Sequence, residues 1–375
     1  MRQLFSYFLV AVVVFAAGTA SAQMETPAKQ AVMIDYDTGT VLLEKNADER
    51  MPTSSMSKVI TMYTVFDAIK NGRLTKDTEL SVSEKAWRMG GSKMFIEVGK
   101  KVKVGDLIQG VIVQSGNDAT VVLAEGVAGT EEAFADMLNT KAQQLGMKNS
   151  HFMNASGWPD PNHYSTANDL AILAWHTIHD FPDEYHYWSE QEFTYNNIKQ
   201  PNRNPLLFRG IGADGIKTGH TEDGGYGLIG SGVMNGRRVI LIVNGLADDK
   251  ERAQESARLL EWGLKAFENV GLFKAGEEID RARVVMGTTG EVPLTVEKDL
   301  IVTLPATVRN DLKVEMVYGG PLEAPVKKGQ KVGTLRITVP RMPVTEVPLV
   351  AAEDVGHIGL FAGTFTKMKI IFGGI

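Results

Sequence analysis

The sequence contains no cysteine, and this absence removes several kinds of chemistry at once. With none among 375 residues, the chain can form no disulfide, no thiolate nucleophile and no cysteine-ligated zinc site. An excess of positive charge is also missing. The formal net charge of −6 gives no reason to expect nucleic acid as a partner. Hydrophobic content of 43% and charged content of 22% are ordinary for a globular protein.

The sequence also lacks an apolar run long enough to span a membrane comfortably. The longest candidate, Tyr7 to Ala17, follows Arg2 and precedes the small residues Ala20-Ser21-Ala22. A short positive region, a short apolar region and an A-x-A site predict a signal peptide over residues 1–22. No cysteine follows the expected cleavage before Gln23, so a lipoprotein is not expected. Export of a chain without disulfides fits a bacterial periplasm or envelope.

The length and the composition predict two domains and a tail. A mature chain of about 350 residues exceeds what one core usually organises. Strands at both ends with helices between them predict an α+β catalytic domain, built on an antiparallel sheet, over residues 23–275. Composition changes near 270–277, and the Val-, Thr-, Pro- and Gly-rich stretch that follows predicts a small all-β domain over residues 276–350. Residues 351–375 form the tail.

Hydrophobic periodicity and turn residues locate the elements of the first domain. Strands are predicted at 32–36, 40–45, 225–233 and 237–244, with hairpin turns at Asp37-Thr38-Gly39 and Met234-Asn235-Gly236. Helices are predicted at 55–70, 104–113, 118–127, 131–145, 167–179 and 247–267.

The tail carries an apolar stripe at helical spacing. Its members recur at steps of three and four: Ile358, Phe361, Phe365, Met368 and Phe372. The segment is too short and too charged to cross a bilayer. Two interpretations follow, a helix docked on its own domain or an amphipathic anchor lying in the membrane interface, and we favour the anchor.

A crowded stretch near the start of the mature chain raises the question of a nucleophile. In "TSSMSKVITMYTVFDAI", residues 53–69, three serines precede Lys58. Ser55 and Lys58 are spaced i, i+3, which places both side chains on one helical face. A lysine made neutral by burial can remove a serine proton. The spacing excludes Ser57, which is adjacent to the lysine, and leaves Ser54 open at i, i+4.

Two triplets further along the chain extend this pattern. Ser115-Gly116-Asn117 lies between helical segments, where a loop offers a hydroxyl for proton relay and an amide for substrate. Lys217-Thr218-Gly219 precedes the strand at 225–233, where a strand edge can pair with an extended peptide. Each triplet alone is ordinary. Their combination in this order is specific.

The set Ser-x-x-Lys, Ser-x-Asn and Lys-Thr-Gly resembles that of penicillin-binding proteins and class A β-lactamases. The strings "QSGNDA", "LGMKNSHFMNASG", "EFTYNNIKQPNRNPLL" and "DGIKTGHT" resemble, more narrowly, low-molecular-weight penicillin-binding proteins that are D-alanyl-D-alanine carboxypeptidases. The resemblance covers residues 28–264 and extends by architecture to the β domain and the tail. It implies that the substrate is a peptidoglycan pentapeptide ending in D-Ala-D-Ala, that β-lactams acylate the enzyme, and that no cofactor or metal is needed.

The resemblance also assigns roles to the motif residues. It implies that Ser55 is the acyl-enzyme nucleophile and Lys58 its general base, that Ser115 assists proton transfer and that Asn117 positions the substrate amide. It implies that the peptide binds along the strand at Lys217, Thr218, Gly219 and His220. The register of the motif selects Ser55 over Ser54. The oxyanion hole is expected at the backbone N–H of Ser55 and one N–H near His220. Arg203, in "NRN", is our candidate for binding the terminal carboxylate.

Several rival interpretations share part of this pattern. A class A β-lactamase has Ser-Asp-Asn and a deacylating glutamate, whereas this chain has Gly116, and its segment 156–169 offers no glutamate. A DD-endopeptidase and a non-catalytic peptidoglycan-binding pseudo-enzyme share the motifs. Gly225, Gly227 and Gly230 match a dinucleotide motif but precede a strand and a hairpin instead of a helix. His176 and His179 lack an evident third metal ligand.

Overall fold

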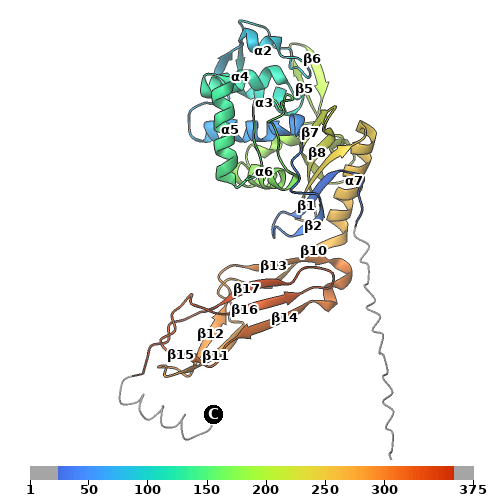
Figure 1. Ribbon diagram of the computed structural model, residues 1–375. Coiled ribbons are helices and arrows are strands. Elements are labelled where there is room, and N and C mark those ends of the chain that lie inside the picture. The colour runs from blue at the N-terminus through green and yellow to red at the C-terminus, as the bar shows by residue number, and fades with distance from the viewer. Residues whose placement is uncertain (1–23, 359–375) are drawn as a thin grey trace, which may run out of the picture.

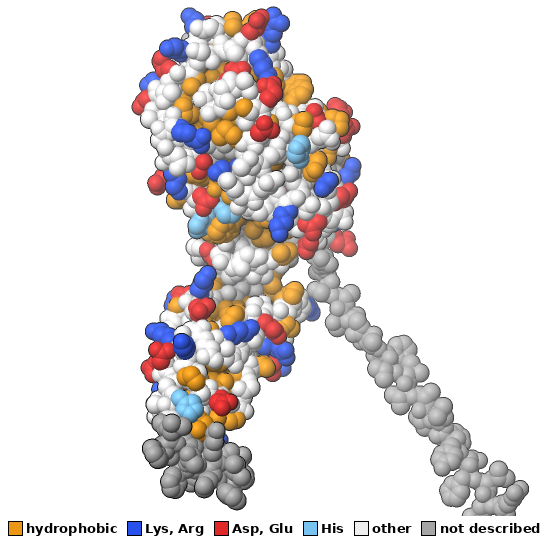
Figure 2. All heavy atoms as spheres, turned by 60° about the vertical axis from the view of Figure 1, so that its left-hand side comes forward, with side chains coloured by type: hydrophobic (Ala, Val, Ile, Leu, Met, Phe, Trp, Pro, Cys, Tyr) orange, Lys and Arg blue, Asp and Glu red, His pale blue; other side chains and the backbone are white. Residues whose placement is uncertain are grey.

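The structure, a computed structural model, describes residues 24–358. The predicted signal peptide, 1–22, and the apolar stripe from Phe361 onward lie outside the described residues. The described chain forms an upper body of helices and sheet and a lower body of strands, joined end to end (Figure 1). On the face shown in Figure 2, acidic and basic side chains are interspersed over both bodies, with no broad surface of one sign.

The upper body is built on a five-stranded antiparallel sheet with the order β2-β1-β9-β8-β7. This order pairs the first long strand of the domain with its last, β9, and leaves β7 at a free edge. The strands are β1 (Gln30–Asp35), β2 (Val41–Lys45), β7 (Ala213–Thr221), β8 (Gly225–Met234) and β9 (Arg237–Leu246).

The central strand β9 shows why this sheet is covered on both faces. Its run "VILIV" is apolar without alternation, as expected for a strand buried on both sides. Ile240 and Ile242 face the larger core beneath the helices, whereas Leu241 faces a second core that includes Leu260 of α7 (Asp249–Ala266). Helix α7 therefore covers one face of the sheet, and the helical cluster covers the other.

The helical cluster packs around α1, which is buried along most of its length. Five of its helices start where the sequence predicts or within a few residues, whereas the short α2 was not predicted. Several begin with side-chain caps, such as Thr130 accepting from the N–H of Ala133. The helices are α1 (Lys58–Lys70), α2 (Glu84–Arg88), α3 (Val104–Ile112), α4 (Asn117–Ala128), α5 (Glu131–Leu145) and α6 (Ala167–Asp180). Short elements complete the upper body: η1 (Ser54–Ser57), β3 (Glu79–Ser81), β4 (Lys101–Lys103), η2 (Tyr185–Ser189), β5 (Glu192–Tyr195), β6 (Ile198–Pro201) and η3 (Pro205–Phe208).

The lower body is the predicted all-β unit with its own core. It contains a six-stranded sheet of order β14-β16-β17-β12-β11-β15 and a two-stranded sheet of β10 and β13. In β16 the buried Leu335 and Ile337 alternate with exposed Arg336, the period expected of a strand with one covered face. The elements are β10 (Phe267–Phe273), β11 (Asp280–Val285), β12 (Glu291–Thr295), β13 (Leu300–Pro305), η4 (Ala306–Asp311), β14 (Lys313–Tyr318), β15 (Leu322–Glu323), β16 (Lys331–Thr338) and β17 (Thr345–Ala351).

The junction between the two bodies lies earlier than the composition indicates. Helix α7 ends at Ala266, and β10 begins at once and pairs with β13 of the lower body. Polar contacts cross the junction: the Thr38 and Thr303 hydroxyls lie 2.5 Å apart, and the Asn269 amide donates to Asp35 at 3.2 Å. Composition does not show this boundary, because the apolar residues of β10 directly continue those at the end of α7.

The C-terminal limit of the lower body lies later than residue 350. Strand β17 runs through Ala351, buried Val355 forms a bridge with Val326, and the N–H of Ile358 donates to the Met286 carbonyl at 2.9 Å. A helix beginning at residue 351 is therefore wrong, because residues 351–358 complete the β domain. Ile358, the first member of the predicted stripe, belongs to this edge.

Candidate active site

Ser55 lies in a tight turn directly before the long buried helix. Residues 54–57 form the 3₁₀ turn η1, and α1 begins at Lys58. The prediction of one continuous helix from residue 55 therefore missed the turn. In a 3₁₀ turn, residues i and i+3 are nearly eclipsed, so this geometry brings the two side chains together directly. The Lys58 amine donates to Ser55 Oγ at 2.8 Å.

The Lys58 side chain is completely buried and has two further acceptors. Its Nζ donates to Asn117 Oδ1 at 2.8 Å and to the Ser156 carbonyl at 2.6 Å. Burial lowers the pKa of Lys58 from 10.5 to about 7; the positive charge of Arg203 lowers it too, while Asp118 raises it. A substantial fraction of the amine is therefore neutral near pH 7.

The acceptors around Lys58 decide what its neutral form does. Both carbonyl oxygens accept and cannot donate, so they hold the two N–H groups of a neutral amine. The remaining lone pair then points to Ser55 Oγ, and the serine hydroxyl becomes the donor. This is the arrangement that a general base needs toward a nucleophile.

The Ser-Gly-Asn loop supplies one of these acceptors and a wall of the site. The Asn117 amide nitrogen donates to the Gly90 carbonyl at 2.8 Å, which fixes its oxygen toward Lys58. Ser115 is buried, with a left-handed φ of 60°. A Cβ on Gly116 would lie 2.9 Å from Asp118 Oδ1 and 3.1 Å from the Met94 nitrogen. The close packing at Gly116 leaves no room for the aspartate found in class A β-lactamases.

The other two serines of the turn are engaged elsewhere. Ser57 Oγ lies 2.6 Å from Thr53 Oγ1 and 2.7 Å from His163 Nε2. Burial lowers the pKa of His163 to about 4, so this ring is neutral near pH 7. Ser54 Oγ contacts Thr221 Oγ1 at 3.4 Å. Neither serine has the contact with Lys58 that Ser55 has, which agrees with the motif register.

The Lys-Thr-Gly triplet lies on the free edge strand β7, beside the turn. A Cβ on Gly219 would lie 2.8 Å from the Thr53 carbonyl, so only glycine permits this close approach. Thr218 and His220 line the cavity, and the His220 ring stacks on Tyr226 with centroids 3.9 Å apart. Lys217 is buried; its Nζ donates to the Thr218 carbonyl at 3.1 Å, and burial together with the charge of Lys58 lowers its pKa well below the ordinary value.

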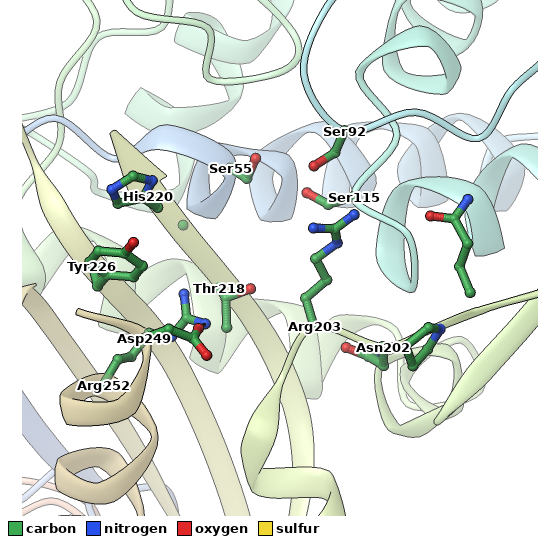
Figure 3. A pocket seen from close by; sticks show the side chains of 13 residues that line it. Ser55, Ser92, Ser115, Asn202, Arg203, Thr218, His220, Tyr226, Asp249 and Arg252 are labelled. Atoms are coloured by element: carbon green, nitrogen blue, oxygen red, sulfur yellow. Dashed lines mark hydrogen bonds and ion pairs between the residues drawn. The ribbon is translucent and has the colours of Figure 1, made fainter. Parts of the chain in front are cut away.

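These elements enclose a cavity of about 640 Å³ in front of Ser55 (Figure 3). Its walls come from η1, the Ser-Gly-Asn loop, β7, the segment after β6 and the first turn of α7. The lining residues are Ser55, Ser92, Ser115, Gln200, Pro201, Asn202, Arg203, Thr218, Gly219, His220, Tyr226, Asp249 and Arg252.

Arg203 reaches into the cavity toward Ser115 from a loop built by its neighbours (Figure 3). Asn202 is buried, and its side chain donates to the Glu190 carbonyl at 2.8 Å and accepts from the Asn204 N–H at 2.9 Å. The Asn204 side chain accepts from the Leu206 N–H. The two asparagines of "NRN" therefore form the loop, and the arginine between them points out of it.

Sequence reasoning missed a second guanidinium in this cavity. Arg252 lies in the first turn of α7, is 6% exposed and has its guanidinium carbon 5.5 Å from the Tyr226 ring centroid. It pairs with Asp249, while its Nε has no hydrogen-bond partner among residues 24–358. No local pattern distinguishes this arginine from the other charges of an amphipathic helix. Its position appears only when α7 is packed on the sheet.

The histidines considered as metal ligands share one carboxylate instead. His176 Nδ1 and His179 Nδ1 contact the two oxygens of Asp180 at 2.9 and 2.8 Å, and Tyr63 donates to the same group. Within the described part of the chain, no group of three or more metal-binding side chains is found.

In this site a serine pairs with a buried lysine at the start of a helix, and that helix faces the edge of an antiparallel sheet. Penicillin-recognising serine enzymes have the same arrangement. The fold and the site place the chain in this class. Comparisons with known proteins narrow the class. The family model described as D-alanyl-D-alanine carboxypeptidase matches residues 17–247, and that described as penicillin-binding protein 5, C-terminal domain, matches residues 267–357. The chain belongs to the D-alanyl-D-alanine carboxypeptidase family.

Two relatives match over most of the chain, and a third matches 64% of it. The chain is 38% identical to D-alanyl-D-alanine carboxypeptidase DacC of Escherichia coli, over 96% of this chain and 93% of the relative. The solved structure of penicillin binding protein 5 from Haemophilus influenzae is 38% identical, with a TM-score of 0.82, covering 89% of this chain and 99% of that one. Penicillin-binding protein D2 from Listeria monocytogenes, solved in its ampicillin-bound form, is 31% identical with a TM-score of 0.60, covering 64% and 99%. The predicted family is confirmed, and so is the predicted fold class of the two domains.

Proposed function

We propose that this protein is a serine-type D-Ala-D-Ala carboxypeptidase that removes the terminal D-alanine from peptidoglycan pentapeptides. The observation that carries the proposal is the three-way contact of the buried Lys58 amine with Ser55, Asn117 and Ser156. Neutral Lys58 takes the proton of Ser55 as Oγ attacks the penultimate D-alanine carbonyl. Ser115 relays the proton to the leaving amine. D-Alanine departs, and water then hydrolyses the ester bond to Ser55.

The substrate enters as an added strand on the free edge of β7. Thr218, Gly219 and His220 pair with its backbone, Asn117 holds its amide, and Lys217 adds positive charge beneath the strand. The guanidinium groups of Arg203 and Arg252, which both line the cavity, bind the terminal carboxylate. The N–H groups of Ser55 and of the strand near His220 stabilise the oxyanion.

β-Lactams acylate the same serine, and the acyl group that they form is hydrolysed slowly. The stretch that follows Ser156, through Asp169, contains no glutamate to activate a deacylating water. A penicilloyl ester on Ser55 therefore persists, and penicillin inhibits the enzyme. This reasoning disfavours the β-lactamase alternative.

A release assay tests the proposed function. Purified protein is incubated with a pentapeptide ending in D-Ala-D-Ala, and free D-alanine is measured together with covalent labelling by a fluorescent penicillin. We expect both signals. Labelling without release would support the non-catalytic binder instead, and the absence of both would contradict the function altogether. Release from cross-linked peptides, measured in parallel, detects endopeptidase activity.

The rate of acylation is expected to rise with pH through about 7. The neutral Lys58 amine is the reactive form, and it is the form that burial favours by lowering the pKa to about 7. Below this pH the rate falls about tenfold per unit, because a single proton blocks the base. The check is the pH profile of kcat/KM for D-alanine release. A rate that is constant from about pH 5.5 to about pH 8.5 would contradict the role of Lys58 as base.

We propose that the protein acts in the periplasm, attached to the outer face of the inner membrane by its C-terminal stripe. In the part of the chain that the structure describes, no helix is long and apolar enough to cross a membrane. The support for attachment is the helical spacing of the apolar residues after Ile358, with Lys367 opposite them.

Removal of the tail tests this attachment. A chain ending at Ile358 keeps the bridges that complete the β domain, so we expect it to fold and retain full carboxypeptidase activity. It should remain in the supernatant with vesicles containing anionic lipid, whereas the longer chain sediments. A truncated protein that still sediments would contradict the anchor.

A further inference from the structure

The residue after the Ser-Gly-Asn triplet, Asp118, is a buried carboxylate with no part in the reaction described above. It lies in the first turn of α4 and is 1% exposed. Its hydrogen-bond partners in the described chain are four backbone N–H groups, with no basic side chain among them. Burying a carboxylate without a basic partner costs free energy, which these N–H groups must offset.

The four N–H groups join the start of α4 to a loop on the other side of the triplet. Asp118 Oδ1 accepts from Met94 at 2.8 Å and from Ala119, in its own helix, at 2.9 Å. Its Oδ2 accepts from Phe95 at 2.9 Å and from Ile96 at 3.4 Å. Phe95 has a left-handed φ of 66° and is half exposed, so its own packing does not hold this backbone. The carboxylate therefore fixes a strained loop.

This loop, residues 92–96, forms one wall of the catalytic cavity. Ser92 lines the cavity (Figure 3), and its carbonyl accepts from the Asn117 N–H at 2.8 Å. The side-chain oxygen of Asn117 in turn accepts from Lys58 Nζ. A Cβ on Gly116 would lie 2.9 Å from Asp118 Oδ1, so the glycine makes room for the carboxylate. The loop, the triplet and the general base are thus connected through Asp118 and its neighbour.

The charged groups around the Lys58 amine come from several elements. Arg203 faces it from the segment after β6, Lys217 from β7, and His163, which is neutral near pH 7, from the loop before α6. Burial and the charge of Arg203 lower the pKa of Lys58, and Asp118 raises it. Among the described groups whose charge acts on this amine, Asp118 is the one carboxylate.

The acylation step gives this negative charge a use. When Lys58 takes the proton of Ser55, a buried neutral amine becomes a buried ammonium. Its other contacts, the oxygens of Asn117 and Ser156, are neutral dipoles. A fixed negative charge nearby stabilises the ammonium more than the neutral amine and so favours the transfer. The N–H groups hold Asp118 in place whether or not the lysine is charged, so no rearrangement is needed.

We propose that Asp118 is a positioning residue for acylation, which fixes the loop 92–96 beside the Ser-Gly-Asn triplet and stabilises the ammonium that forms on Lys58. The inference rests on the proposed carboxypeptidase function and adds to it a residue that does not touch the substrate. Asp118 acts through Asn117 and Lys58.

The pH dependence of acylation by a penicillin tests the proposal, with the second-order rate constant as the readout. Asp118→Asn keeps the shape of the side chain and removes its charge. Above about pH 8 we expect a rate about tenfold lower than that of the wild type, because the base is weaker. The rise of the rate with pH should move to lower pH, because a cause that raises the pKa of Lys58 is lost. The ratio of wild-type to variant rates therefore becomes smaller from about pH 8.5 to about pH 5.5.

Two further variants separate the charge from general effects of burial. Asp169→Asn is the matched control, because Asp169 is another buried carboxylate, 4% exposed, and its charge is not among those that act on Lys58. It accepts from the Asn149 N–H and the Ser150 hydroxyl, so its loss should lower the melting temperature. The midpoint of the pH profile should stay unchanged. Asp118→Glu keeps the charge, so its midpoint should stay close to that of the wild type even where its rate is lower.

The outcomes distinguish this inference from the function on which it rests. A ratio of wild-type to Asp118→Asn rates that does not change with pH, or a midpoint that moves to higher pH, would overturn the inference and leave the function intact. Asp118→Ser, which keeps a hydroxyl acceptor, is measured beside Asp118→Asn as a second neutral variant. If neither neutral variant folds, the charge serves stability instead of acylation, and the inference is wrong. A wild type that penicillin does not acylate, and that releases no D-alanine, would contradict the proposed function itself.

Discussion

Replacing Lys58 by methionine is expected to lower the rate of acylation by about 10³-fold while the protein stays folded. Methionine fills a similar volume in the buried site but has no lone pair that can take the Ser55 proton. Because the lysine carries no buried counter-ion in its hydrogen bonds, its removal leaves no unpaired charge behind. The measurement is the second-order rate constant for labelling by a penicillin, together with the melting temperature.

Lys58→Arg separates the need for a base from the need for charge. An arginine keeps the positive charge but does not deprotonate in proteins, so it should be as inactive as methionine. The matched control is Lys70→Met, a change at the exposed end of the same helix, which should have the rate of the wild type. An active Lys58→Arg variant would show that charge, not proton transfer, is what this position supplies.

Ser55→Ala is expected to lower carboxypeptidase activity by at least about 10⁴-fold. No other group in the turn can replace the lost nucleophile, because Ser54 contacts Thr221 and Ser57 contacts Thr53 and His163. The variant should still bind substrate, since the arginines and the edge of β7 are unchanged. D-Alanine release under saturating peptide is the readout.

The neighbouring serines provide the comparison for this variant. Ser54→Ala removes one long hydrogen bond and should retain most activity. Ser57→Ala breaks the buried contact with His163, so we expect a moderate loss of stability, about 1 kcal/mol, and a small effect on the rate. If Ser54→Ala were the inactive variant and Ser55→Ala the active one, the register of the motif would be wrong.

Local spacing predicted the centre of this site because the site is built on one turn. Ser55 and Lys58 are three residues apart, and both helical and 3₁₀ geometry bring such residues together. The 3₁₀ form itself was not predicted, because it follows from Gly219 and Gly157 packing against the turn from distant parts of the chain. A Cβ on Gly157 would overlap the Ser54 carbonyl.

The groups that sequence reasoning missed come from packing between distant segments. Arg252 reaches the cavity only because α7 covers β8 and β9 with its first turn next to His220 and Tyr226. Such residues have no signature in the local sequence.

The elements of the fold were predicted better than the limits of its domains. Long amphipathic or fully apolar runs, such as α5 and β9, are strong local signals, and they lie where expected. The junction at Phe267 and the end of the β domain at Ile358 depend on strand pairing with remote partners, β13 and the segment around Met286. Pairing partners are not visible in composition, so both limits were misplaced.

The intact mass of the protein after brief exposure to penicillin tests the central claim most directly. The wild type should gain the mass of one penicillin molecule, and peptide mapping should place it on Ser55. Ser55→Ala should remain unmodified under the same conditions, while Ser54→Ala should be modified like the wild type. A penicilloyl adduct on Ser55→Ala, or an adduct of the wild type mapped to another residue, would contradict the account.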